Sequence, residues 1–193
     1  MDLIVKGGIF IWPILLEAVI GLYFILERGF YFLFVLRKRL AVLRQVSDPT
    51  SPPEGTDGGE TLTALLGAVR SGRVNSELVR LAAERDVQSA EHGLTALSII
   101  AQTAPLLGLL GTISGLIRAF IKIQKYTGAV NPSMLAGGIW EALLTTAAGL
   151  SVAIPVLIAY DYFASQVVRY ERELANHIEV WLDELRRRGC EIV

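Results

Sequence analysis

The stretch GGIWEALLTTAAGLSVAIPVLIAY, residues 137–160, decides the fold of this chain. It holds one charged side chain, Glu141, and the 19 residues from Ala142 to Tyr160 carry neither a charge nor a histidine. A helix rises about 1.5 Å per residue, so a run of this length crosses a hydrocarbon layer of roughly 30 Å. The stretch therefore predicts a membrane-spanning helix.

Two further segments have the same character. The 25 residues of segment 93–117 contain no charged residue or histidine, and segment 7–26 is interrupted only by Glu17. No segment shows a convincing strand pattern. We therefore predict an all-α integral membrane protein with three transmembrane helices, the later ones short of polar residues and rich in glycine and alanine.

The basic residues predict how the chain is oriented. They follow the first and third spans, at Arg37, Lys38, Arg39, Arg44, Arg169 and Arg172, whereas the connection between the second and third spans has only Lys122 and Lys125. Because positive charge collects on the cytoplasmic side, the N-terminus is expected outside and the C-terminus inside. Long helices then extend from the membrane into the cytoplasm.

Composition along the chain predicts five parts. They are the first transmembrane helix with its cytoplasmic extension (1–46), a flexible linker rich in proline, glycine and acids (47–60), cytoplasmic helices (61–92), the second and third transmembrane helices (93–163) and a C-terminal cytoplasmic amphipathic helix (164–193). Asn75 and Ser76 are candidate caps of a helix that runs on into the second span. Apolar residues at steps of three and four form a stripe along the last helix: Phe163, Val167, Tyr170, Leu174, Ile178, Trp181 and Leu185.

Several function classes are disfavoured by composition. A net charge of −1 does not suit nucleic acid as the main partner. The single Cys190 and the isolated His92 and His177 do not form a metal site. We find no nucleophile–base pair and no phosphate-binding loop, so we expect neither an enzyme nor a bound cofactor.

Small residues recur on the two later spans. The second span has them at steps of four, three and four, and the third has an adjacent pair: Ala104, Gly108, Gly111, Gly115, Ala148 and Gly149. Such residues let helix backbones approach closely in lipid. Plain bundle packing explains this pattern by itself, and Thr112 within it could simply bond to its own helix.

The locations of two acidic side chains, Glu141 and Glu17, can each be interpreted in two ways. Glu141 either lies at the outer headgroups, with the span beginning at Ala142, or faces a protein interior or water-filled cavity, where carboxylates mark ion pathways. Glu17 is either a second pathway residue or a side chain that reaches the outer interface. The residues alone leave both questions open.

At this point a family resemblance becomes visible. GLLGTISGLIRAF (108–120) and GGIWEALLTTAAGLSVAIPVLIAYD (137–161) resemble the paired signatures of the MotA/TolQ/ExbB proton-channel family, most closely its ExbB/TolQ branch. By motif position, Thr112 matches the pore threonine of the second span, Glu141 the glutamate of the third span and Thr146 a threonine that faces the partner helices. Thr145 stands where the family often has a small residue, so no role is transferred to it.

The resemblance implies a setting for these residues. It implies a homopentamer in the bacterial inner membrane, surrounding a dimer of a single-span partner similar to ExbD or TolR. That partner supplies an intramembrane aspartate, and a TonB-like or TolA-like client receives the work. The chemistry of this chain agrees, because threonine hydroxyls form hydrogen bonds but do not titrate, which leaves the chain an incomplete conductor.

The expected function is thus a proton-channel or motor subunit that couples the proton-motive force to periplasmic or outer-membrane work, such as TonB-dependent transport. The alternative is a non-conducting membrane scaffold that assembles by helix packing. Whether the ion is a proton or sodium, and whether the client process is nutrient uptake, envelope maintenance or motility, is not specified by these residues.

Overall fold

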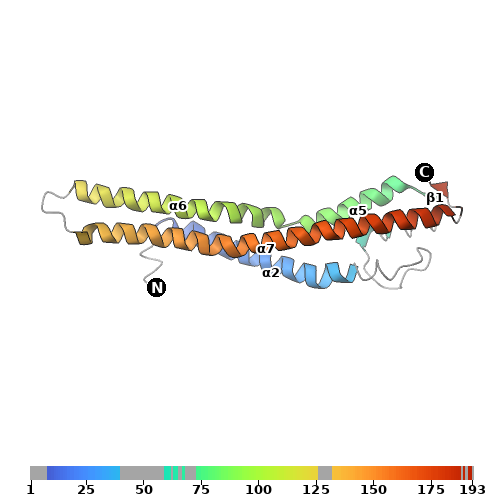
Figure 1. Ribbon diagram of the computed structural model, residues 1–193, viewed down its shortest axis with the longest axis horizontal. Helices are drawn as coiled ribbons and strands as arrows, with labels where there is room; N and C mark the ends of the chain where they lie inside the picture. The colour runs from blue at the N-terminus through green and yellow to red at the C-terminus, as the bar shows by residue number, and fades with distance from the viewer. Residues whose placement is uncertain are drawn as a thin grey trace. The chain divides into compact units, whose positions relative to one another are not determined.

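The computed structural model describes residues 8–39, 59–61, 63–64, 67, 73–125, 132–187, 189 and 191–192 (Figure 1). Its helices are α2 (Ile11–Phe30), continued by the π-helical segment η1 (Tyr31–Leu36), then α5 (Ser76–Glu91), α6 (Leu94–Gln124) and α7 (Pro132–Arg187). Strands β1 (Arg73–Val74) and β2 (Glu191–Ile192) pair in parallel. The described chain is therefore helical, as predicted, apart from this short ladder.

Three of the described helical segments are long and apolar enough to cross a membrane, which confirms the three predicted spans. They are Ile11–Arg39, Ser76–Gln124 and Ala136–Arg187. Large apolar side chains such as Val19, Leu106 and Ile158 are exposed on them, as expected for surfaces that face lipid. The orientation with the N-terminus outside and the boundaries of the five parts stay predictions, and segment 47–60 lies outside the described residues except for its last two.

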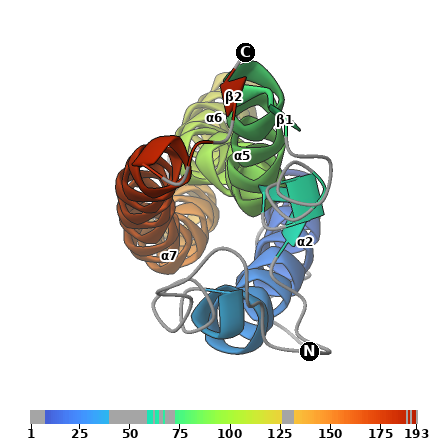
Figure 2. The same cartoon turned by 90° about the vertical axis from the view of Figure 1, so that its right-hand side faces the viewer.

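The chain divides into two compact units. The first comprises Met1–Leu26 and Leu94–Asp161, and the second comprises Glu27–Gly93 and Tyr162–Val193. In the first unit, α6 runs alongside the N-terminal part of α7 (Figure 1). In the second, α5 lies beside the C-terminal part of α7, as Figure 2 also shows. Helix α7 thus contributes to both units.

The amphipathic helix predicted to run on into the second span ends instead at Glu91. Asn75 caps its beginning, accepting hydrogen bonds from the backbone amides of Glu77 and Leu78 at 3.0 and 3.2 Å. Gly93 then has a φ of +80°, a conformation open to glycine, and α6 begins one residue later. This turn separates α5 from α6 and corrects the expectation of one continuous helix.

The apolar stripe of α7 forms the core of the second unit. All seven residues predicted for the stripe are buried, from Phe163 at 6% exposed to Leu185 at 0%. Val79, Ala82 and Ala90 of α5 are buried as well, and the ring of Phe32 stacks on that of Phe163 at 5.2 Å between centroids. The stripe is therefore covered by other segments of the same chain.

A buried carboxylate lies at the centre of the second unit. Asp86 of α5 is 3% exposed and forms an ion pair with Nη1 of Arg39 at 3.2 Å. It also accepts hydrogen bonds from the amides of Glu60 and Thr61, at 3.0 and 2.9 Å, and from the Thr61 hydroxyl at 2.6 Å. Both oxygens have donors, which offsets the cost of burying the charge. One side chain thus fastens α5 to two other parts of the chain.

The phenol of Tyr170 lies close to this carboxylate. Burial, and secondarily the negative charge of Asp86, raise the pKa of Tyr170 from 10.0 to about 12, while the positive charge of Arg39 opposes the change. The folded unit therefore favours the neutral phenol.

We predict a loss of stability at alkaline pH that depends on Tyr170. Because its pKa is higher in the folded chain, the neutral phenol stabilises fully below pH 10 and loses that contribution between pH 10 and about 12. Thermal unfolding of the detergent-solubilised protein, followed by circular dichroism at pH 9 and pH 11.5, should show a smaller drop in midpoint for Tyr170→Phe than for the wild type. Equal drops would contradict the assignment.

Candidate functional site

Helices α6 and α7 of the first unit meet along a surface of small residues. Gly108, Gly111 and Gly115 are all buried. A Cβ atom at Gly111 would lie 2.6 Å from the hydroxyl oxygen of Thr145, and one at Gly115 would lie 3.0 Å from the Cβ of Ala142. The two backbones therefore approach closely, and there is no room for a larger side chain at these positions.

The remaining predicted packing residues continue this surface toward the other end of the pair. Gly149 is buried, and a Cβ there would lie 2.5 Å from the carbonyl oxygen of Ala104, which is itself 0% exposed. Ala148 is half-buried beside it. Thr145 is 1% exposed and donates to the carbonyl of Ala142 at 2.8 Å, so its position inside the helix pair is that of a packing residue.

Two threonine hydroxyls from the facing helices bond to each other. The hydroxyls of Thr112 on α6 and Thr146 on α7 are hydrogen-bonded, and both side chains are half-buried. Thr112 also lies 3.2 Å from the carbonyl oxygens of Gly108 and Ala142, and Thr146 lies 3.1 Å from that of Gly108. The structure thus brings together two of the three predicted pathway residues.

The hydrogen count of this threonine pair matters for its chemistry. Two hydroxyl hydrogens serve four contacts, because the carbonyl oxygens can only accept. Either hydroxyl can therefore rotate toward a new acceptor while the other keeps a backbone carbonyl satisfied. The pair can donate to a carboxylate or accept from a carboxylic acid without itself changing charge.

Glu141, the third predicted pathway residue, has a charged partner in the same chain. Its Oε1 forms an ion pair with Nη2 of Arg118 on α6, with side chains 25% and 41% exposed. The backbone of Gly8 passes so close that a Cβ there would overlap the Glu141 carboxylate. The carboxylate therefore lies between the Arg118 guanidinium and the Gly8 backbone.

Glu17 of α2 contacts a different face of α6. Its Oε1 accepts a hydrogen bond from the Thr103 hydroxyl at 2.7 Å, and its Oε2 is buried without a hydrogen-bond partner among the described residues. Thr103 precedes Thr112 by nine residues, or about two and a half turns, so the two threonines point to opposite sides of α6. Glu17 thus lies on the far side of α6 from the threonine pair.

Among the described residues, no group of three or more His, Cys, Asp or Glu side chains is placed to hold a metal ion.

Comparison with known proteins identifies the family. The family model described as "MotA/TolQ/ExbB proton channel family" matches residues 61–176 of this chain. This match covers more than half of the chain and includes both motifs. The chain belongs to the MotA/TolQ/ExbB family. An ExbB-like biopolymer transport protein of Synechocystis sp. is 33% identical over 95% of this chain and 81% of its own length.

Other relatives place the chain in the ExbB/TolQ branch. Biopolymer transport protein exbB1 of Vibrio cholerae is 28% identical over 91% of this chain and 85% of its own length. The Tol-Pal system protein TolQ of Haemophilus influenzae is 35% identical over 58% of this chain and 48% of its own length. The resemblance drawn from the two motifs is confirmed. Together with three membrane-capable helices, this membership supports an energy-transducing subunit of the bacterial inner membrane.

The sequence alone did not identify Arg118 as the partner of Glu141 in this member of the ExbB/TolQ branch. Arg118 lies on α6 and Glu141 on α7, each two to three turns from the connection between the two helices. A short connection forces the helices to be antiparallel neighbours, so residues at similar distances from it lie at similar depth. The similar distance of Arg118 and Glu141 from the connection could therefore have predicted that the two side chains pair.

We predict that Gly149→Ala weakens the α6–α7 pairing, because the new methyl group meets a backbone carbonyl that cannot rotate away. The loss of stability should be about 1–3 kcal/mol. Gly137→Ala is the matched control, since nothing lies within 4 Å of a Cβ at that exposed helical position. Denaturation by dodecyl sulfate, followed by circular dichroism, should separate the two variants, and equal stability would contradict the close approach.

We also predict energetic coupling between Arg118 and Glu141. In a double-mutant cycle of Arg118→Gln and Glu141→Gln, the coupling should be about 1 kcal/mol or less, because both side chains are partly exposed. The same dodecyl sulfate titration measures it. Strictly additive effects would show that the two side chains do not interact.

Proposed function

We propose that this chain is the channel subunit of an inner-membrane complex that converts an ion gradient into mechanical work. The observation that supports it best is the hydroxyl pair of Thr112 and Thr146, which bridges α6 and α7 inside the membrane-capable unit. Several copies, as a homopentamer, would surround a dimer of a single-span partner similar to ExbD or TolR. The orientation with the N-terminus outside is part of the proposal.

The mechanism follows from what these side chains can and cannot do. Thr112 and Thr146 do not titrate, so the group that takes up the proton is a carboxylate supplied by the partner helix. While that carboxylate is charged, the two hydroxyls donate to it. When it gains a proton it becomes a donor, the hydroxyls turn back to the carbonyls of Gly108 and Ala142, and the hold on the partner helix weakens.

Glu141 would serve as a wall residue of this path. Its pairing with Arg118 keeps the carboxylate at a fixed position near the connection between α6 and α7. A fixed charge pair there shapes the entry of a cation without passing the proton on itself. An ion falling through 100 mV releases about 2.3 kcal/mol, enough to bias a helix between two positions.

The work would be passed to a TonB-like or TolA-like client. This part of the proposal rests on the relatives, whose names refer to biopolymer transport and to the Tol-Pal system. The competing function is a scaffold that does not conduct, which would use the small-residue surface of α6 and α7 only for assembly.

Ion flux in proteoliposomes tests the proposal. The chain is co-expressed with an aspartate-bearing single-span protein, and proton and sodium flux are measured separately. Thr112→Val and Thr146→Val should each lower flux about tenfold or more, as expected for one lost hydrogen bond of about 1.4 kcal/mol in the conducting state. Thr112→Ser keeps the hydroxyl and should retain most of the flux.

Thr95→Val is the matched control, because Thr95 is an exposed threonine of the same helix without a described side-chain hydrogen bond. All variants are first checked for assembly by size-exclusion chromatography. Wild-type flux in every assembled variant, or a complex that conducts nothing, would favour the scaffold over the channel.

A further inference from the structure

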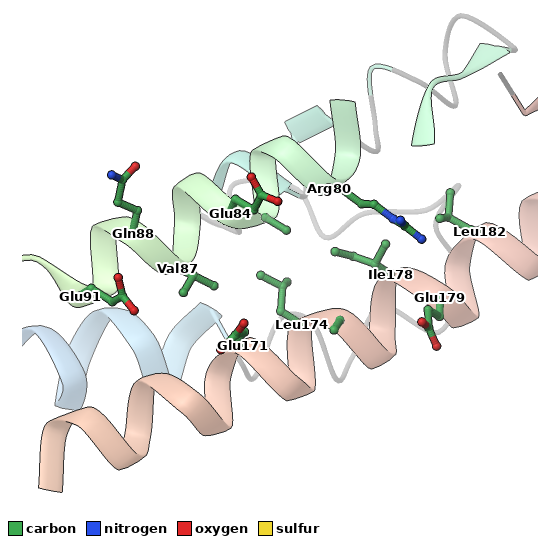
Figure 3. Close-up of a pocket in the computed structure, with 12 residues that line it drawn as sticks. Arg80, Glu84, Val87, Gln88, Glu91, Glu171, Leu174, Ile178, Glu179 and Leu182 are labelled. Atoms are coloured by element: carbon green, nitrogen blue, oxygen red, sulfur yellow. The ribbon is translucent and has the colours of Figure 1, made fainter. Parts of the chain in front are cut away.

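A groove between α5 and α7 lies in the second unit, and the proposed channel function makes no use of it. It has a volume of about 730 Å³ and lies wholly within that unit. Val87 points from α5 toward α7, and Leu174 and Ile178 point back from α7 (Figure 3). Leu174 and Ile178 are themselves only 1% and 5% exposed, whereas Val87 and Leu182 are half-buried and Ala175 is exposed. The apolar surface that the groove leaves open, its floor, is therefore that of Val87, Ala175 and Leu182.

The rim of the groove is acidic. Glu84 and Glu91 of α5 and Glu171 and Glu179 of α7 are exposed along it, against the single cation Arg80. Four carboxylates and one guanidinium leave a net charge of −3. Within the described part of the chain, none of these four glutamates forms an ion pair. The rim thus lacks the positive charge that would balance it.

The spacing of the acids matches a helix. Glu84 and Glu91 are seven residues apart, and Glu171 and Glu179 are eight apart, so each pair is separated by about two helical turns, or roughly 11 Å. An occupant with an apolar stripe facing the floor would place its flanking residues against both rims at that same repeat. Lysine or arginine at those flanking positions would neutralise both rows.

The two ends of the groove differ in charge. Arg80 extends from α5 toward Leu182 at one end (Figure 3), whereas Glu91 and Glu171 mark the other. The carboxyl end of α5 adds the negative end of its helix dipole beside Glu91. The most basic part of an occupant is therefore expected at the Glu91 and Glu171 end.

From this arrangement we propose that the groove binds a basic amphipathic helix of another protein, which adds a third helix to the α5–α7 pair. We choose a basic helix as the occupant because its positive charge would complement the glutamates of the rim. A second copy of this chain is the competing occupant, and the experiment below distinguishes the two.

Binding is measured with the full chain in phosphatidylcholine nanodiscs, with empty nanodiscs as the background. The probe is a helical peptide of leucine and lysine, about 18 residues long so that it is helical when bound, with a heptad leucine stripe. Its counterpart has glutamate in place of every lysine. We expect saturable binding of the lysine peptide that weakens with salt, and no binding of the glutamate peptide.

Two variants make the measurement specific to the groove. Glu91→Gln combined with Glu171→Gln should weaken binding of the lysine peptide about fivefold or more, since it removes two pairing charges of the rim. Glu77→Gln with Glu184→Gln is the matched control, which removes two negative charges from the same helices away from the groove and should change affinity less than twofold.

The second-copy alternative is tested with a cysteine at Ala175 in a Cys190→Ser background. A photo-crosslinker attached there should join the protein to the lysine peptide. Crosslinking between copies of the chain that the peptide does not reduce would overturn the proposal in favour of self-association. Equal binding of both peptides, or no binding at all, would overturn it as well.

Discussion

The close approach of α6 and α7 is the constraint on which the membrane-capable unit depends. Lipid gives helices little hydrophobic reason to associate, so backbone proximity has to come from residues without bulk. Gly111 against Thr145 and Gly149 against the carbonyl of Ala104 provide it. The same proximity places the Thr112 and Thr146 hydroxyls within bonding range, so the polar chemistry is a consequence of the packing.

Much of this organisation could be predicted from the sequence, because it rests on local patterns. Uncharged runs of membrane length predict the spans, and a three–four repeat predicts the buried face of α7 from Phe163 to Leu185. The pairing of Thr112 with Thr146 follows the same rule as that of Arg118 with Glu141, because the two threonines lie at similar distances from the connection between α6 and α7. The family motifs singled out both residues, and their roles in conduction stay predictions.

The features that sequence reasoning missed involve charges whose partners lie far along the chain. Asp86 looks like one more solvated acid of an amphipathic helix, and its burial depends on Arg39 and Thr61 arriving from other segments. Arg118 directly follows the uncharged segment 93–117, and its partner Glu141 lies 23 residues later on the next helix. The end of α5 could have been predicted from Gly93, a glycine just beyond the last amphipathic turn. The apolar run that follows this glycine suggested instead that the helix continues.

The Asp86 carboxylate has one more consequence, for how the free energy of folding depends on sequence separation. Arg39 and Glu60 both bind this side chain, so it brings together two positions that are 21 residues apart in the sequence. The entropic cost of bringing two chain positions together rises by only about 0.6 kcal/mol for each doubling of the number of residues between them. The stability that Asp86 gives the second unit should therefore depend little on how many residues separate Arg39 from Glu60.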